Sequence, residues 1–321
     1  MFSMDSGILE IFGNMVTLFA IVGVGYAAKK LNLMNDTFDK SLSKVIINLA
    51  LPAMILGSVL TAEELPSLEN ILLTFLLSCA SYAVIIVIAY ALTAIMRISI
   101  GHRGVFKFML TFGNVGFIGF PVLSAIFGKQ ALIYAAVFNL PFNFLVFTMG
   151  IWFLTQDNNN SQKSNTTWRT FLSPAIASCV IAIICTLLNI HAVPVLGDSL
   201  ETLGSLTTPA ALLIIGSSLA NMPVRDLIGG FRLWVASLFR LIVNPLCIWF
   251  VFHFFVSDPL LLAVVVVISG MPVATNGTML CYQYGGDSKT MAQGTFVTTV
   301  LAIISIPVLV TALSVLGVVV M

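Results

Sequence analysis

The sequence contains very little charge. Only 8% of its 321 residues are Asp, Glu, Lys or Arg, whereas 59% are hydrophobic and the mean hydropathy is +1.07. A soluble domain carries about 25% charged residues. This composition therefore excludes an ordinary soluble protein and indicates an integral membrane protein surrounded by lipid. The net charge of +1 gives no sign of a nucleic-acid partner, and we expect none.

Groups that carry enzyme chemistry or hold metals are also scarce. The five cysteines are scattered in apolar segments and lack metal-ligand spacing, so we interpret them as small core residues. The three histidines lie far apart, and no Asp or Glu falls inside any predicted span except Glu10, which is near the start of the first. We therefore predict neither an enzyme nor a cofactor, and no proton-relay carboxylate at membrane depth. The first ten residues also lack the basic start of a cleavable signal peptide.

Ten apolar stretches are long enough to cross about 30 Å of hydrocarbon, which takes about 20 helical residues. Arg240, in the eighth stretch, is the only charge well inside one of them. The sequence therefore predicts an all-α integral membrane protein with ten transmembrane helices. The stretches are 8–28, 45–62, 70–95, 107–127, 130–154, 171–190, 203–222, 232–256, 259–283 and 290–317.

Basic residues between these stretches are distributed very unevenly. If the loops alternate between two sides, one side receives Lys129 alone. The other side receives Lys29, Lys30, Lys40, Lys44, Arg97, Arg103, Lys107, Lys163, Arg169, Arg225, Arg232 and Lys289. The basic side of a membrane protein faces the cytoplasm. We therefore expect a plasma (inner) membrane protein with both termini outside and the polar loop 156–170 in the cytoplasm.

The loop 156–170 divides the chain into residues 1–155 and 171–321, each with five stretches. An odd number of spans gives the two halves opposite orientations. The second and seventh stretches share Pro-Ala followed by a small pair, and the fourth and ninth share Gly-x-Pro, at offsets of 157 and 151 residues. These patterns predict two inverted five-helix repeats. The small pairs are Gly57-Ser58 and Gly216-Ser217, which follow Pro52-Ala53 and Pro209-Ala210.

The two Gly-x-Pro motifs, Gly119-Phe120-Pro121 and Gly270-Met271-Pro272, lie deep inside their stretches. Proline has no amide proton and its ring clashes with the carbonyl four residues back, so each motif predicts a broken helix. The start of the second half-helix then presents unpaired N–H groups and a positive dipole end near the middle of the membrane. Two such ends would bind an anion without a fixed positive charge. The alternative interpretation is that both motifs are kinks where glycines pack between helices.

Several polar side chains and glycines near these motifs are candidates for substrate binding. Asn114 and Asn276 can donate to a carboxylate, whereas Asn139 and Asn143 lie on one helix face and are explained equally well as contacts to a neighbouring helix. We expect Arg240, about 12 Å from the basic end of its stretch, to snorkel to the interface or line a cytoplasmic vestibule, with direct substrate contact as the alternative. The predicted substrate-binding residues are Asn114, Gly116, Gly119, Pro121, Asn139, Asn143, Gly270, Pro272, Thr275, Asn276 and Arg240.

The segment from Asn114 to Pro121, with Gly119 two residues before the proline, resembles the fourth-span crossover of the auxin efflux carrier family. That family includes plant auxin exporters and bacterial permeases assigned to malate or malonate. The resemblance covers essentially the whole chain. It is also carried by Asn48 to Pro52, Arg240 to Pro245, Tyr284 twelve residues after Pro272, Gly294 and Pro307.

The resemblance implies a particular architecture. It consists of two inverted five-helix repeats with broken, crossed helices 4 and 9, similar to sodium/proton antiporters and bile-acid sodium symporters. Helices 1, 2, 6 and 7 would form a scaffold that dimerises with a second copy. Helices 3–5 and 8–10 would form a transport domain that moves like an elevator. The loop 156–170 is much shorter than that of many plant members, so regulation through that loop is not carried over.

We therefore predict a secondary transporter, a permease or efflux carrier, that binds small organic anions such as carboxylates where helices 4 and 9 cross. The alternative is a sodium-coupled symporter of the same fold, in which Thr275, Thr278 and backbone carbonyls coordinate Na⁺. A receptor or structural membrane protein is disfavoured, because the sequence has no extramembrane domain through which it would signal. The substrate, the direction of transport and the coupling ion stay open at this level.

Overall fold

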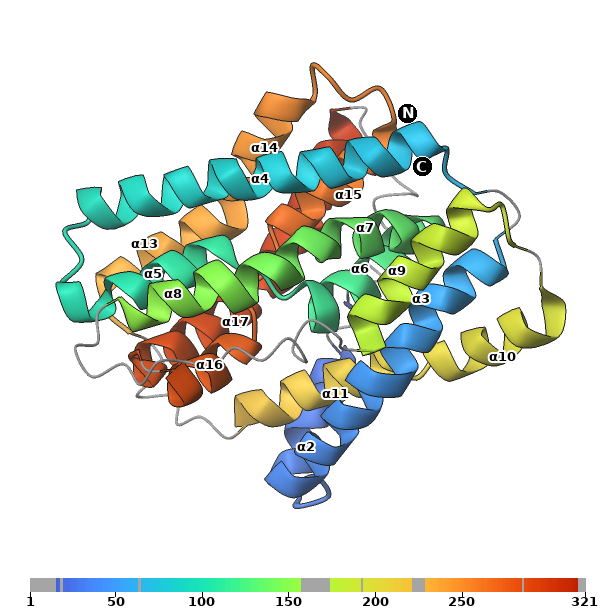
Figure 1. Cartoon of the computed structure of the whole chain (residues 1–321). Coiled ribbons are helices and arrows are strands. Elements are labelled where there is room, and N and C mark those ends of the chain that lie inside the picture. The colour runs from blue at the N-terminus through green and yellow to red at the C-terminus, as the bar shows by residue number, and fades with distance from the viewer. Residues whose placement is uncertain are drawn as a thin grey trace.

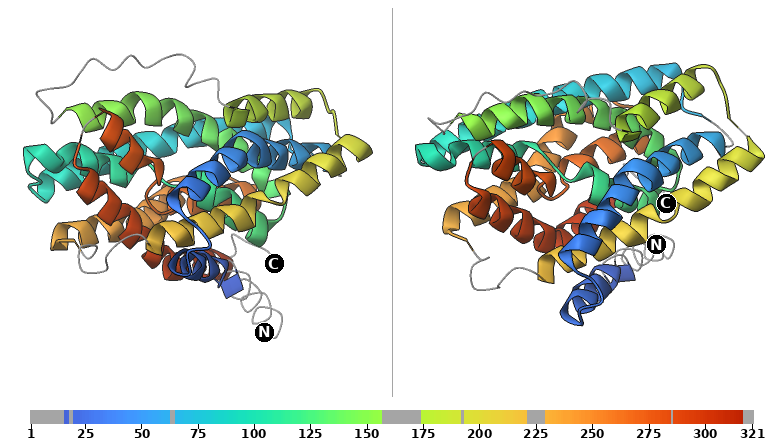
Figure 2. Two further views of the ribbon diagram at one scale, coloured as in Figure 1. Left: turned by 90° about the horizontal axis from the view of Figure 1, so that it is seen from below. Right: turned by 60° about the horizontal axis from the view of Figure 1, so that its bottom comes forward.

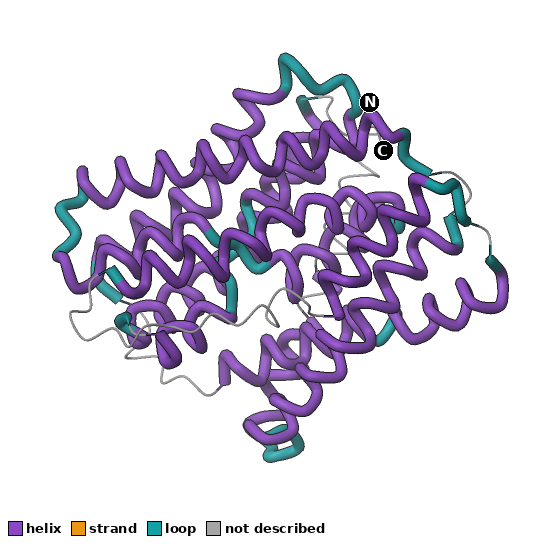
Figure 3. The backbone as a smooth tube through the Cα atoms, viewed as in Figure 1, coloured by secondary structure: helices purple, strands orange, loops and turns teal. Residues whose placement is uncertain are grey.

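The computed structural model describes residues 16–17, 20–62, 65–156, 174–191, 193–220, 229–284 and 286–316. Within these residues the regular structure is helical, apart from one antiparallel bridge between Gly113 and Val273 (Figure 3). About half of the first predicted stretch and nearly all of the loop 156–170 lie outside the described residues.

Six of the described helices or joined helices are long and apolar enough to cross a membrane: Asp36–Leu60, Leu68–Ile95, Gln130–Thr155, Pro194–Ser217, Phe231–Phe252 and Ser288–Val315. Three shorter apolar helices are Val115–Phe127, Ala177–Leu187 and Pro259–Ser269. This agrees with an all-α integral membrane protein. Many large apolar side chains on the outer helices are exposed, among them Leu76 and Val87 on α4 (Leu68–Ile95) and Ile304 on α17 (Ser288–Val315). Such a surface suits contact with lipid.

Three prolines are preceded by a single π-helical turn. The turns Ile46–Ala50, Val115–Gly119 and Phe239–Val243 end two residues before Pro52, Pro121 and Pro245. In each case the residue before the proline donates its N–H to the carbonyl five residues back, not four. A proline supplies no N–H and pushes away the carbonyl four residues back, so the wider turn lets the helix continue.

Two predicted spans begin earlier than expected. The span predicted at 45–62 begins at Asp36, where α2 (Asp36–Val45) leads through a π-helical turn into α3 (Leu51–Leu60). The span predicted at 203–222 begins at Pro194, where α10 (Pro194–Gly204) leads into α11 (Thr207–Ala220). These helices contain Asp39 and Glu201, so the prediction that no acidic residue lies inside a span is wrong. The hydropathy of the sequence placed the start of each span after the nearest charged residues. The helices begin earlier, because Asn35 caps the start of α2 and Pro194 suits the first turn of α10.

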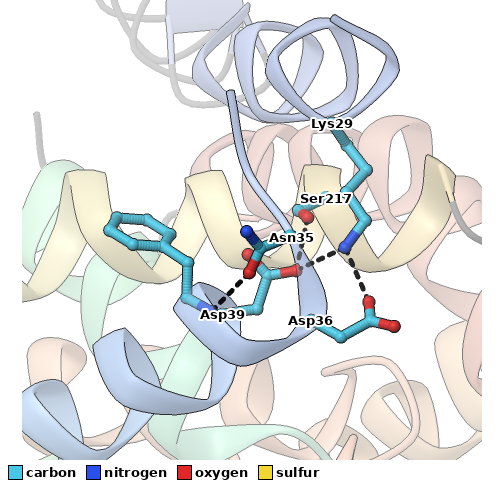
Figure 4. Close-up of polar contacts among 6 residues, drawn as sticks. Lys29, Asn35, Asp36, Asp39 and Ser217 are labelled. Carbon is cyan, nitrogen blue, oxygen red and sulfur yellow. Dashed lines mark hydrogen bonds and ion pairs between the residues drawn. The ribbon is translucent and has the colours of Figure 1, made fainter. Parts of the chain in front are cut away.

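Asp39 is held by residues from two other segments (Figure 4). Lys29 Nζ lies 3.0 Å from its Oδ2 and 2.6 Å from Oδ1 of Asp36, and Ser217 on α11 donates to the same Asp39 oxygen at 2.6 Å. Asn35 caps the helix by accepting from the N–H of Phe38. The cluster ties α2 to α11 and gives Oδ2 of the partially buried Asp39 two polar partners, whereas Oδ1 of the same carboxylate is buried without a partner among the described residues.

The helices form two groups that lie side by side (Figures 1 and 2). In the first group, α3 packs against α9 (Pro174–Leu187) and α10, and α2 packs against α11. In the second, α4 packs against α5 (Ile100–Thr111) and α7 (Gln130–Leu145), with α8 (Ile151–Thr155) continuing from α7. The rest of that group is α13 (Phe231–Leu238), α14 (Asn244–Phe252), α15 (Pro259–Ser269), α16 (Asn276–Tyr284) and α17. The groups meet where α6 (Phe120–Phe127) and α7 contact α3, α9 and α11.

Glycines set the closest helix crossings within the first group. A Cβ on Gly204 would overlap the backbone of Met54, and one on Gly57 would lie 3.0 Å from the backbone nitrogen of Glu201, so α3 and α10 touch backbone to backbone. A Cβ on Gly216 would overlap the carbonyl of Val22 in the same way. The small pairs noted in the sequence therefore lie at crossings, as is usual between membrane helices.

Candidate functional site

Two unwound segments from distant parts of the chain cross and pair with each other. The first joins α5 to the helical run Val115–Phe127, and the second joins α15 to α16. The N–H of Asn114 donates to the carbonyl of Pro272 at 2.7 Å, and the N–H of Ala274 donates to the carbonyl of Phe112 at 3.0 Å. These two bonds form the antiparallel bridge and satisfy backbone groups that a membrane interior would otherwise leave unpaired.

The two Gly-x-Pro motifs do not play the same part in these breaks. Pro272 lies in the unwound segment, as predicted, and its carbonyl is one of the paired groups. Pro121 lies in the first turn of α6, and its helix breaks seven to nine residues earlier, at Phe112 to Asn114. The prediction of a break at Pro121 is therefore wrong. A proline in a first turn needs no N–H donor, and the π-helical turn Val115–Gly119 accommodates its ring.

The carboxyl ends of α5 and α15 are held by two side chains from one helix. Arg240 is only 3% exposed, and its Nε donates to the carbonyl of Met271 at 2.9 Å. Its Nη1 donates to the carbonyls of Leu110 and Thr111 at 3.0 and 3.1 Å. Asn244, four residues on, donates to the same Leu110 carbonyl at 3.0 Å. The expectation that Arg240 snorkels or lines a vestibule is wrong, because these carbonyls hold its head group inside the protein.

Two further residues fit the crossing closely. A Cβ on Gly113 would overlap Nη2 of Arg240, so only glycine leaves room for the guanidinium. Thr298 on α17 accepts a hydrogen bond from the N–H of Val273 at 3.0 Å and itself donates to the carbonyl of Gly294. Thr298 thereby pairs the N–H of Val273, which takes no part in the two hydrogen bonds of the bridge.

Asn114 begins the helical run after the first unwound segment. Its Oδ1 accepts from the N–H of Phe117 at 3.1 Å, which is the bond of an N-cap. Its Nδ2 is buried and has no hydrogen-bond partner among the described residues. Asn276 is the first residue of α16, and its Oδ1 is likewise buried without a partner in the described part of the chain. A buried amide atom without a partner costs free energy. Nδ2 of Asn114 and Oδ1 of Asn276 are therefore the atoms that a polar ligand could pair with.

The glycines differ in the space around them. Apart from its chain neighbours and its own helix, no described residue has an atom within 4 Å of the place where a Cβ on Gly116 would stand, so this side of the helix start faces open space. Gly119 has only ordinary contacts there. Gly270 is different, because a Cβ would lie 3.0 Å from Leu309 and 3.1 Å from Pro245, so this glycine serves packing.

Asn139 and Asn143 lie on α7, next to Pro141. Nδ2 of Asn143 donates to the backbone carbonyl of Asn139 at 2.8 Å, a bond within the same helix. Oδ1 of Asn139 is buried without a partner among the described residues. Thr275 directly precedes α16 and Thr278 lies in its first turn, both half-buried. Their part in a sodium site stays a prediction, and the described residues contain no cluster of His, Cys, Asp or Glu that could hold a metal.

A cavity of about 160 Å³ lies between the two groups of helices. Lys129, before α7, forms an ion pair of 2.6 Å with Glu201 of α10 across it. Ser124 of α6 lines it together with the hydroxyls of Ser58, Ser205 and Thr208. The lining is mixed, because Met54 and Leu132 also contribute, and it includes Lys129, the one base that the loop analysis places on the non-cytoplasmic side.

Sequence reasoning missed three residues of the crossing: Gly113, Asn244 and Thr298. The spacing of Arg240 and Asn244, four residues apart before Pro245, was a usable signal, because it places both on one helix face. Nothing in the sequence pointed to Thr298, which meets the crossing only through the packing of α17.

Comparisons with known proteins identify a family. The family model described as "Membrane transport protein" matches residues 10–310. A protein of Methanocaldococcus jannaschii named "Uncharacterized transporter" is 25% identical over 89% of this chain and 93% of its own length. A second "Uncharacterized transporter", from Methanothermobacter thermautotrophicus, is 22% identical over 91% of this chain and 95% of its own length.

A third relative carries a substrate in its name. A "Putative malonate transporter" of Rhizobium meliloti is 23% identical over 92% of this chain and 94% of its own length. All three relatives are named as transporters and align along nearly their whole length. With its multiple apolar helices and the family match over nearly all its residues, the chain belongs to the membrane transport protein family, the auxin efflux carrier family that its sequence motifs resemble.

Proposed function

We propose that this protein is a secondary transporter that moves small organic anions, such as carboxylates, and binds them where the two unwound segments cross. The observation that carries the proposal is the unpartnered Nδ2 of Asn114 at the start of a helix that begins at the crossing. The name of the Rhizobium meliloti relative supports a dicarboxylate of the size of malonate as the substrate.

Electrostatics at the crossing favours an anion. The helical run Val115–Phe127 and α16 both begin there, so their positive dipole ends lie near the crossing. The negative ends of α5 and α15 are neutralised by Arg240. The open space beside Gly116 gives a small anion room next to the first of these helix starts.

The contacts between helices support an elevator-type movement. The group of α2, α3, α9, α10 and α11 would be the scaffold, which we propose pairs with a second copy of the chain. The group that contains the crossing would be the transport domain. The two groups touch mainly through α6 and α7, and the cavity with Lys129 lies between them, where an anion from the outside would enter.

Contacts between helix ends support spans of alternating direction, which two inverted five-helix repeats require. The starts of α4, α7 and α15 are joined where Asp258 accepts from Asn70 and Tyr134. The starts of α5 and α17 meet in the pair of His102 with Asp287 at 2.8 Å. We propose that this second set of ends is cytoplasmic, because Arg97, Arg103, Lys107 and Lys289 lie next to it in the sequence, and that both termini lie on the other side of the inner membrane.

Transport by the purified protein in proteoliposomes tests this function. Uptake or exchange of labelled malonate and malate is measured for the wild type, Asn114→Ser and Asn114→Asp. Ser and Asp keep the oxygen that caps the helix, so both variants should fold. Ser removes the amide donor and should raise the KM about 10- to 100-fold, the value of one hydrogen bond to a charged group. Asp adds a negative charge and should abolish transport.

Asn48→Ser is the matched control, because Asn48 is exposed and its side chain donates to the Lys44 carbonyl in its own helix. It should transport as the wild type does. Unchanged kinetics in both Asn114 variants would show that the crossing is not the binding site. If the wild type moves no organic anion under any gradient, the proposed function is wrong.

A further inference from the structure

Arg240 is a buried charge without an acidic partner. Its side chain is 3% exposed in the π-helical turn Phe239–Val243, and no described Asp or Glu forms an ion pair with it. A charge at this depth is costly unless other groups compensate it. The compensation comes from the backbone carbonyls of Leu110, Thr111 and Met271.

These carbonyls belong to two helix ends that point at each other. Leu110 and Thr111 end α5, and Met271 follows the last turn of α15. The last carbonyls of a helix lack partners within it and carry its negative dipole end. Two such ends in contact would repel each other unless a positive charge lay between them.

In broken-helix transporters, this combination of unwound carbonyls and half-helix carboxyl ends can coordinate a cation such as Na⁺. Carbonyl oxygens are also ligands that a hard cation prefers. Here the guanidinium takes that place, and Gly113 leaves the room that its Nη2 occupies. Asn244 completes the arrangement by donating to Leu110 as well.

We propose that Arg240 is a built-in cation at the crossing, which takes the role of a bound coupling ion and makes anion binding independent of Na⁺. The inference rests on the proposed function, because it concerns the anion site at the same crossing. Arg240 is a positioning residue here: it holds the two carboxyl ends together and leaves the amino ends for the anion. It removes the need for the sodium site considered at Thr275 and Thr278.

The experiment compares the wild type with Arg240→Ala, Arg240→Lys and Arg232→Ala. Arg232 is an exposed base near the start of the same helix, so it serves as the matched control. Malonate binding is measured by calorimetry in detergent, with Na⁺ or choline as the only added cation. Melting temperatures are recorded in parallel, with and without guanidinium chloride at tens of millimolar.

Wild type and Arg232→Ala should bind malonate equally in Na⁺ and in choline. Arg240→Ala should lose about tenfold or more in affinity, because bonds to a charged group are lost, and guanidinium should restore both its binding and its melting temperature. Arg240→Lys should keep part of the affinity, because an ammonium supplies the charge without the fork of donors. A wild type that needs Na⁺ for binding, or an Arg240→Ala variant that binds like the wild type in choline, overturns the inference.

Two outcomes separate this inference from the proposed function. If the wild type binds no carboxylate in any buffer, the proposed function fails, and the melting temperatures alone decide the role of Arg240. Guanidinium should then raise the melting temperature of Arg240→Ala and not that of the wild type, and no such rescue overturns the inference. If Arg240→Ala does not fold, malonate binding by the wild type and by Arg240→Lys in Na⁺ and in choline tests the inference. Binding that needs Na⁺ in the wild type overturns it.

Discussion

Gly113→Ala tests the crossing most directly. The added methyl group would overlap Nη2 of Arg240 and lie 3.3 Å from the Met271 carbonyl, so the guanidinium must move away from the carbonyls. Loss of one hydrogen bond to a charged group costs about 1.5–3 kcal/mol, and overpacking in a tight core costs about 1–3 kcal/mol. Because both figures describe the same displacement, we expect the free energy of unfolding to fall by about 2–4 kcal/mol.

Thermal unfolding in detergent, followed with a thiol-reactive dye, measures this loss. Cys179 and Cys281 are buried free thiols that react only when the protein opens. At about 2 °C per kcal/mol for a chain of this size, the melting temperature should fall by about 4–8 °C. Gly116→Ala is the matched control, because no atom of another described segment lies within 4 Å of its added Cβ.

Gly116→Ala should melt like the wild type but bind malonate more weakly if the open space beside it holds the anion. If Gly113→Ala instead melts at the wild-type temperature, the close contact between Gly113 and Arg240 is wrong. If both variants lose stability equally, the reasoning from local space fails.

Two further predictions concern helix ends. Asp258 accepts from Tyr134 at 2.9 Å, so Asp258→Ala should cost about 2–4 kcal/mol and Tyr134→Phe about 1 kcal/mol. In a double-mutant cycle, Tyr134→Phe should add little once Asp258 is gone, and full additivity would contradict the contact. Asp287 caps α17. Partial burial raises the pKa of its carboxyl, but hydrogen bonds from Thr290 and the nearby His102 outweigh this effect and lower the pKa. Its ionised form therefore stabilises the fold above the unfolded pKa, and this contribution is lost as the pH falls through the lower folded pKa. Asp287→Asn should lower stability by about 1 kcal/mol at pH 7, with the difference closing below about pH 4 in melting curves. If Asp287→Asn were destabilised equally at pH 7 and below about pH 4, the stabilising role of the ionised Asp287 would be refuted.

The position of the helix breaks shows how far local sequence rules reach. A proline inside an apolar stretch correctly indicated an interrupted ninth span, where Pro272 lies in the unwound segment. In the fourth span the same rule chose Pro121, although the chain unwinds at Phe112 to Asn114. A proline forbids a regular interior turn, but a π-helical turn or a first-turn position satisfies it equally well. Which solution occurs depends on whether a partner strand, here Pro272 to Ala274, is present to pair the unwound backbone.

The sequence by itself determined that this is an all-helical membrane protein of a transporter family, because long apolar runs, loop charges and family motifs are written along the chain. It also indicated Asn114 as a residue near a helix break, because the spacing of Asn114 and Pro121 carries the family resemblance. Only the tertiary structure decided the role of Arg240. From the sequence, a single base eight residues from a helix end should reach for water. In the folded protein the carboxyl ends of α5 and α15, distant in sequence, bring three carbonyls to it. The electrostatic attraction of those carbonyls depends on how the helices pack, and no local pattern records it.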